Sequence, residues 1–139
     1  MRYLKRFNED LTQDEIKELT EFGQDCLSFL LDEGFEFDYE RSIGDCWWLD
    51  LYGPQDEYEN PIAYTWDQVK DYYIPFLHLL KARYNLVDDS LGRTIHVKMG
   101  AGQDVATSFA NYTFDEVVNE QSEMPKKIYC LSVKVSDKI

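Results

Sequence analysis

The chain has 139 residues, the size of one domain that can bury most of its apolar surface without disulfides or metals. Its formal net charge is −13, which predicts repulsion from nucleic acid and anionic membranes and attraction to basic protein surfaces. The acidic excess lies in residues 1–92, which contain 21 acidic residues (Asp and Glu) and 8 basic residues (Lys and Arg). Residues 93–139 contain 6 acidic and 6 basic residues. The same charge is also compatible with a role in solubility alone.

Three cysteines, Cys26, Cys46 and Cys130, cannot all pair within one chain, and none lies in a CxxC or Cys/His cluster. Free thiols in a reducing cytoplasm fit this pattern better than disulfides or a zinc site. The basic residues 1–7 are followed by the polar residues 8–10 rather than by an apolar stretch, so they do not form a signal peptide. No run approaches the ~18 apolar residues of a membrane span. We therefore expect a soluble, cytoplasmic protein that binds no membrane.

The first predicted helix covers residues 13–33. Thr12 and Glu15 form a capping box, in which each side chain accepts a hydrogen bond from the other residue's backbone N–H. Apolar residues then recur at helical spacing: Ile16, Leu19, Phe22, Cys26, Leu27 and Leu30. Gly34 follows at the position where a left-handed residue often ends a helix. Ahead of the helix, residues 1–11 could be an arm that packs on the domain or docks to a partner.

The next segment, residues 35–53, predicts a β-hairpin with one apolar and one charged face. Aromatic residues alternate with carboxylates in its first strand: Phe35, Phe37 and Tyr39 with Glu36, Asp38 and Glu40. Residues 42–45 supply the turn, where Gly44 can adopt a positive φ. The return strand carries Trp47 and Trp48, and this much aromatic area needs helices to cover it.

An acidic loop follows, and the remaining elements come after it. The loop, residues 54–61, is bracketed by two prolines. A second long helix is predicted at residues 66–84, behind another capping box. Residues 94–99 and 128–135 alternate as strands, and a third capping box opens a short helix at residues 114–121.

These elements predict a single α+β domain over residues 1–139. The simplest arrangement is a four-stranded, mainly antiparallel sheet with the two long helices on one face and one short helix. No internal repeat and no linker divides the chain. Residues 100–112 give no clear prediction of conformation.

Three segments resemble small uncharacterised accessory proteins of tailed bacteriophages: MRYLKRFNE, LLDEGFEFDYE and TWDQVKDYYIPFL. The resemblance covers residues 1–84. It implies a phage origin, and therefore action in the cytoplasm of the host cell, but it brings no catalytic residues.

Catalytic motifs are absent from the sequence. Gly100 and Gly102 follow a strand but lack the third Gly or the Lys-Ser/Thr of a phosphate-binding loop, and there is no HExxH or GxSxG. His78 and His96 are isolated from other metal-ligating or nucleophilic residues in the sequence. We therefore predict no catalytic residue, no cofactor and no metal, and we favour a non-enzymatic protein over an enzyme.

Two alternatives stay open. One is a small metal- or nucleotide-dependent enzyme, or a ligand-binding domain, with a site near Asp45, Asp50 and His96. In that case the strand carboxylates of residues 36–40 could hold Mg²⁺ or Ca²⁺, although a solvated strand face explains them as well. The other is a component of virion assembly. The oligomeric state is not predicted.

The favoured hypothesis is an acidic surface that binds a basic partner without contacting nucleic acid itself. The predicted partner-binding residues are Glu36, Asp38, Glu40, Trp48, Asp56, Glu57, Tyr58 and Glu59. Carboxylates of the first helix could join them: Glu18, Glu21 and Asp25. Such a surface could mimic phosphates or complement a basic groove, with aromatic residues supplying affinity. We predict that the protein binds and inhibits a host protein, such as a defence or nucleic-acid enzyme.

Overall fold

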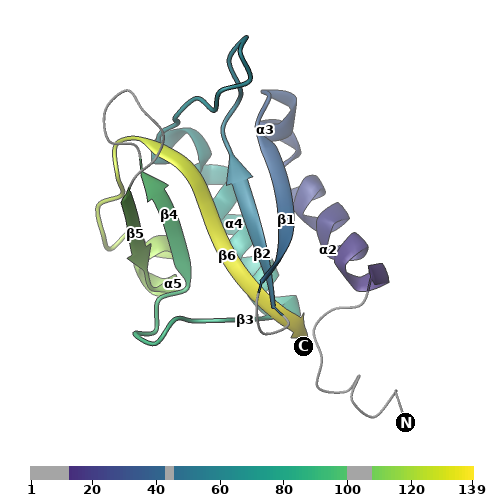
Figure 1. Cartoon of the computed structure of the whole chain (residues 1–139). Coiled ribbons are helices and arrows are strands. Elements are labelled where there is room, and N and C mark those ends of the chain that lie inside the picture. Colours follow the sequence, from purple (N-terminus) through teal and green to yellow (C-terminus); the bar gives the residue numbers. More distant parts are fainter. Residues whose placement is uncertain (1–12, 43–45, 100–107) are drawn as a thin grey trace.

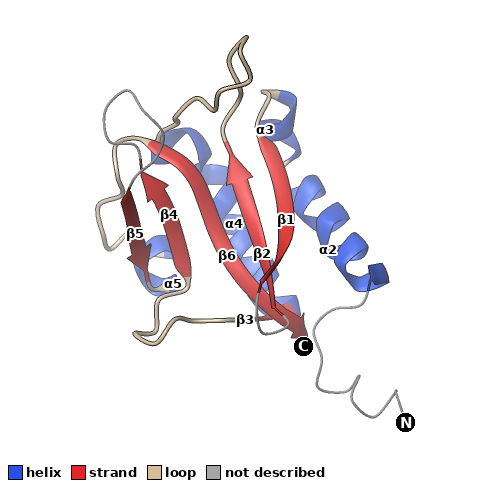
Figure 2. Cartoon of the chain, in the orientation of Figure 1, coloured by secondary structure: helices blue, strands red, loops and turns tan. Residues whose placement is uncertain are grey.

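The computed structural model of the chain describes residues 13–42, 46–99 and 108–139. A twisted antiparallel sheet forms one layer and the helices form a second layer against one of its faces (Figures 1 and 2). Several predictions lie outside the described residues: the arm at 1–11, the start of the first capping box at Thr12, the turn with Gly44 and Asp45, and the glycines Gly100 and Gly102.

The sheet is built around the C-terminal strand. Its strands are β1 (Glu36–Ser42), β2 (Cys46–Tyr52), β3 (Tyr84–Leu86), β4 (Ile95–Met99), β5 (Ser108–Tyr112) and β6 (Ile128–Lys138). The order is β1-β2-β6-β4-β5, with β3 also paired to β6, and every pairing is antiparallel. β6 therefore pairs with β2 along one edge and with β4 and β3 along the other, so it joins the N-terminal hairpin to the C-terminal half of the chain.

The predicted α+β fold with a mainly antiparallel sheet is confirmed, but the predicted number of four strands is wrong, because the sheet has six. β3 is three residues long and begins directly after the last residue of the preceding helix, so no turn signal marks it. β5 lies in the segment that gave no prediction. Its side chains do not alternate between buried and exposed, because it forms the outer edge of the sheet.

The helices are α2 (Gln13–Cys26), α3 (Ser28–Asp32), α4 (Trp66–Arg83) and α5 (Phe114–Val118). The predicted helix at 13–33 is divided at Leu27, whose φ of −108° and ψ of 16° leave the helical region. Backbone hydrogen bonds continue on both sides, from Leu27 N to Gly23 O and from Leu31 N to Leu27 O, each 3.0 Å long. The division is therefore a local distortion. No described helix combines the length and the apolar character needed to cross a membrane.

Two of the three predicted capping boxes lie wholly in the described residues, and both form. At the start of α4, the Thr65 hydroxyl accepts from the Gln68 N–H and the Gln68 side chain accepts from the Thr65 N–H. Thr113 and Glu116 make the same exchange at the start of α5. Each box satisfies backbone donors that a helix start leaves unpaired, so it fixes where the helix begins.

The hydrophobic core lies between α2, α4 and the sheet face that they cover. From the helices it receives Ile16, Leu19, Val69, Tyr73, Phe76, Leu77 and Leu80. From the sheet it receives Phe37, Trp47, Leu49, Leu51, Ile95, Val97, Leu131, Val133 and Val135. Because strand side chains alternate, burying these residues forces their neighbours onto the opposite face, which no described helix covers (Figure 2).

Candidate functional site

The uncovered face of the sheet, called here the open face, carries rows of polar side chains that cross the strands. Strand register aligns one residue from each of five strands in a first row: Asp38, Asp50, Ser132, His96 and Asn111. A second row on the same face, two residue pairs further along, holds Glu36, Tyr52, Cys130, Lys98 and Phe109. The fold thus gathers polar and aromatic groups that lie up to 96 positions apart in the chain.

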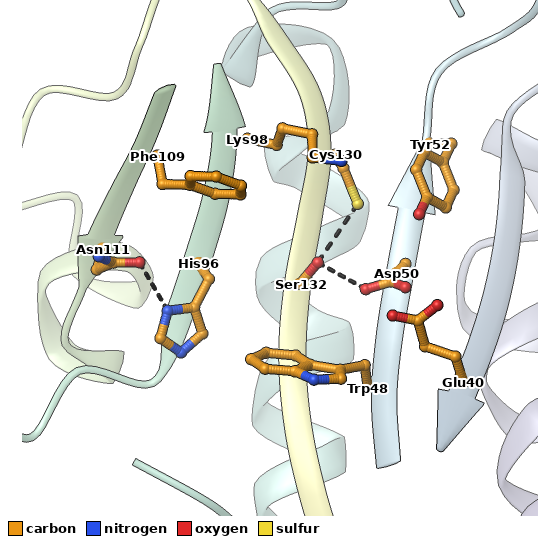
Figure 3. Close-up of a pocket in the computed structure, with 10 residues that line it drawn as sticks. All are labelled: Glu40, Trp48, Asp50, Tyr52, His96, Lys98, Phe109, Asn111, Cys130 and Ser132. Atoms are coloured by element: carbon orange, nitrogen blue, oxygen red, sulfur yellow. Dashed lines mark hydrogen bonds between the residues drawn. The ribbon is translucent and has the colours of Figure 1, made fainter. Parts of the chain in front are cut away.

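A cavity of about 360 Å³ lies on the open face, centred on these rows (Figure 3). It is lined by Glu40, Trp48, Asp50, Tyr52, His96, Lys98, Phe109, Asn111, Cys130 and Ser132. Its volume falls in the range of small-ligand sites, and its mixture of aromatic rings with a few converging polar groups is typical of them.

Asp50 lies on the floor of the cavity, with only 5% of its surface exposed. Its Oδ1 accepts a hydrogen bond of 2.6 Å from the Ser132 hydroxyl. Burial raises the pKa of Asp50 from 3.8 to about 6, the Ser132 hydrogen bond opposes the rise, and the charges of Glu40 and Asp38 add to it. The carboxyl therefore exchanges its proton close to neutral pH, unlike an exposed Asp.

His96 faces the cavity from the other side of Ser132 and is held by two neighbours. Its Nδ1 lies 2.7 Å from the side-chain oxygen of Asn111, which can only accept, so Nδ1 carries the proton. Its ring meets the ring of Trp48 edge-on, with 5.3 Å between the centroids. Because the Ser132 hydroxyl donates to Asp50, its proton is directed to that carboxylate and not to the His96 ring, unlike the proton of a serine nucleophile paired with a histidine base.

The thiol and the phenol of the second row are not activated. Burial, reinforced by the charge of Asp50, raises the pKa of Cys130 to about 12, so the thiol stays protonated at neutral pH. Burial also raises the pKa of Tyr52 above its ordinary value. These groups therefore act as hydrogen-bonding and apolar walls, and the arrangement supports ligand binding better than nucleophilic catalysis.

The aromatic rings of Trp48, Tyr52 and Phe109 border the cavity. Trp48 is half-buried, and the Lys134 ammonium lies 4.7 Å from the centroid of its ring. Phe109 is 65% exposed although it belongs to a strand, so a large apolar ring stands in solvent at the cavity wall.

The predicted partner-binding residues fall into two groups. Glu36, Asp38, Glu40 and Trp48 lie together on the open face, where the three carboxylates are exposed along the edge strand β1. The other four belong to the loop 53–62, which projects beyond the end of β2 (Figure 1).

The loop carboxylates differ in what they do. Asp56 accepts from the N–H groups of Tyr58 and Asn60 at 2.8 and 2.9 Å, and these bonds lower its pKa, so it holds the loop together. Glu57, Glu59 and Tyr58 are exposed, Tyr58 by 76%. Glu59 has a φ of 65°, a conformation uncommon outside glycine and found in tight turns.

The helix carboxylates predicted as possible members of the surface lie in the other layer. Glu18, Glu21 and Asp25 belong to α2, which packs on the covered face of the sheet (Figure 2). Trp66 is the first residue of α4. It is 9% exposed, and its ring packs edge-on against the ring of Tyr73 in the core. The carboxylates of α2 therefore lie on the other side of the sheet from the open face.

Sequence reasoning named Asp50 and His96 as one alternative site, and the structure brings both to the cavity; Asp45 lies outside the described residues. It did not find Ser132, Lys98 or Asn111. The alternation of β6 placed Ser132 away from the core, but only strand order sets it between Asp50 and His96.

The described residues contain no group of three or more His, Cys, Asp or Glu side chains that could hold a metal ion. Glu36, Asp38 and Glu40 alternate along one extended strand, which separates successive side chains on one face by about 6.5 Å, too far to close on one ion. The chain matches no protein-family model, and no curated protein and no solved structure matches it.

Proposed function

We propose that this protein acts by binding, without catalysis, to a protein that has a basic surface, and that the open face of its sheet makes the contact. The partner class we propose is a host protein whose groove ordinarily holds nucleic acid, with inhibition as the result. The observation that carries the proposal is the line of exposed carboxylates Glu36, Asp38 and Glu40 on a sheet face that no described helix covers.

The charge distribution supports this reading. β1 is an edge strand, and its residue Glu40 pairs with Trp48 and lines the same cavity as Phe109 of the opposite edge strand β5, so acidic and aromatic groups share one face of the sheet. Charges on a rim mainly accelerate association and select the partner, whereas desolvated aromatic rings supply much of the affinity. The acidic excess of residues 1–92 and the resemblance to phage accessory proteins favour a basic host partner.

The test compares two variants of equal charge in affinity capture from host lysate. The open-face variant neutralises the strand carboxylates: Glu36→Gln, Asp38→Asn and Glu40→Gln. The control neutralises exposed helix carboxylates: Glu21→Gln, Asp25→Asn and Asp32→Asn. We expect the wild type and the control to retain the same partner, and the open-face variant to bind it on the order of tenfold more weakly. Equal loss in both variants would mean that only net charge matters.

Salt separates the two contributions to binding. A partner lost between low and high salt is held mainly by exposed charges, because salt screens them, whereas one retained at high salt is held mainly by the aromatic groups. If no partner is captured at either salt concentration, the proposal is refuted.

A second candidate, a ligand-binding domain, is favoured by one observation, the cavity around Asp50. A nucleotide or divalent metal that raises the melting temperature of the wild type, and fails to raise that of Asp50→Asn, would support it. Symmetric self-association in light scattering would instead favour a component of an assembly.

A further inference from the structure

The open-face cavity contains a buried carboxylate that forms no recorded ion pair with a described cation. Asp50 is the only Asp or Glu among the described residues that is buried, at 5% exposed. The ion pairs recorded for these residues involve Asp67, Asp89 and Glu120, and none reaches Asp50. A buried carboxylate is expensive unless a charge or several donors satisfy it, and here a single hydroxyl, that of Ser132, does so.

A second carboxylate faces the same space. Glu40 belongs to β1, two residue pairs along from the pair of Asp38 and Asp50, and Figure 3 shows its carboxylate directed toward that of Asp50. The negative charge of Glu40 repels that of Asp50 and helps to disfavour the ionised form of Asp50. One cation placed between them would relieve the repulsion and replace the solvent that Asp50 has lost.

From this geometry we propose that the cavity binds one guanidinium group, with the carboxylates of Asp50 and Glu40 as its acceptors. A guanidinium presents five N–H donors in a plane, so it can serve two carboxylates on neighbouring strands at once. It is also more weakly hydrated than an ammonium, which suits a partly buried site. This inference goes beyond binding to a basic surface because it assigns one chemical group to one cavity.

The aromatic walls suit the same group. Guanidinium planes stack on aromatic rings, and Trp48, Tyr52 and Phe109 all line the cavity. Trp48 already has the Lys134 ammonium 4.7 Å from its ring centroid, so the protein itself uses this indole as a cation acceptor.

Lys98 is the one cation that lines the cavity, and it does not fill the proposed site. Its backbone belongs to β4, and Figure 3 shows its side chain crossing β6 and ending beside Cys130. No recorded ion pair joins it to a described carboxylate. Its effect on the pKa of Asp50 is smaller than the effects of Glu40 and Asp38. Lys98 therefore makes the electrostatic potential in the cavity slightly more positive and leaves the carboxylates of Asp50 and Glu40 available to a ligand.

The experiment titrates the full chain with Nα-acetyl-argininamide at low ionic strength, followed by NMR chemical shifts. The control ligand is Nα-acetyl-citrullinamide, which has nearly the same shape and no charge. We expect the arginine compound to bind with a dissociation constant on the order of 1 mM, and the citrulline compound to bind at least about tenfold more weakly. Equal affinities of the two compounds, or no binding of the arginine compound, would overturn the proposal.

Variants locate the site. Asp50→Asn should weaken binding at least about tenfold, whereas Asp71→Asn, the same change at an exposed position of α4, should leave it unchanged. A melting temperature of Asp50→Asn at or above that of the wild type shows that the variant is folded. Lys98→Gln should bind as tightly as the wild type or more tightly. Binding of the arginine compound that is unchanged in Asp50→Asn, or that is lost in Lys98→Gln, would contradict the assignment.

Two further probes distinguish the source of the group. An arginine side chain of a partner is indicated if Nα-acetyl-argininamide binds more tightly than methylguanidine, and a free guanidino compound is indicated by the reverse. Both results support a guanidinium site. None of these titrations uses the partner protein, so their failure leaves the acidic-surface proposal to its own test.

Discussion

Replacing Asp50 by Asn should stabilise the protein at neutral pH, because it removes a buried charge while keeping the shape of the side chain. Asn can still accept the hydrogen bond from Ser132 through its side-chain oxygen, and its amide can donate toward Glu40. The variant therefore removes the ionisation of Asp50 and little else. At a site of direct ligand contact, a gain in stability would mark a group retained for binding rather than for folding.

The magnitude follows from the proton affinity of Asp50. A carboxyl whose pKa is higher in the folded than in the unfolded chain binds its proton more tightly when folded. The contribution of Asp50 to the free energy of unfolding therefore falls as the pH rises from 3.8 to about 6, and stays at the lower value above that range. At about 1.4 kcal/mol for each pH unit, the full difference is about 3 kcal/mol. We expect Asp50→Asn to be about 1–3 kcal/mol more stable than the wild type above about pH 7, and nearly equal to it at about pH 4.

The assay is urea denaturation of both proteins at several pH values between about 4 and about 8. Asp71→Asn serves as the matched control, and it should differ from the wild type by less than about 0.5 kcal/mol at every pH. A stability difference between Asp50→Asn and the wild type that does not vary with pH would refute the reasoning. Destabilisation of Asp50→Asn at neutral pH would refute it too. Either result would mean that burial does not disfavour the ionised form of the Asp50 carboxyl.

Three other predictions test the fold around the site. Thr65→Ala removes the capping box of α4 and should lower the free energy of unfolding by about 1 kcal/mol in denaturant titrations, whereas Thr65→Ser should recover most of it. Gly53→Ala should lower the free energy of unfolding by about 2 kcal/mol or more, because the added Cβ would overlap the backbone oxygen of Ile62 at the base of the acidic loop. An unchanged free energy of unfolding would show that the loop backbone moves to accommodate the Cβ. Burial holds the pKa of Cys130 at about 12, so iodoacetamide should alkylate it in denaturant and not in the native protein, as read by peptide mass spectrometry; rapid native alkylation would show that the cavity floor opens.

The hairpin and the long helices could be predicted because each is encoded locally. The alternation of aromatic residues and carboxylates in residues 35–40 matches β1, where Phe37 is buried and Glu36 and Asp38 are exposed. The capping box of Thr65 starts α4 where predicted. β3 and β5 have no such local signal, because both are short and owe their structure to hydrogen bonds with β6 and β4.

The site was less predictable because it depends on register between distant strands. The sequence indicates that Asp50 and Ser132 each lie in a strand, but their pairing requires that β6 lie beside β2, 82 residues away in the chain. Burial of Asp50 follows from that pairing, since a carboxylate in an edge strand, such as Asp38, stays exposed. The local sequence pattern therefore predicts the acidic strand β1, but it does not predict the row of polar residues that crosses the sheet.

Site-specific photo-crosslinking in cells tests most directly whether the open face is the binding surface. A photoreactive amino acid would be placed at Glu40, on the open face, and in a second protein at Glu21, on the exposed side of α2 in the other layer. We predict a crosslink to one partner from position 40 and none from position 21. A crosslink from position 21 alone would place the binding surface on the helices and contradict the account.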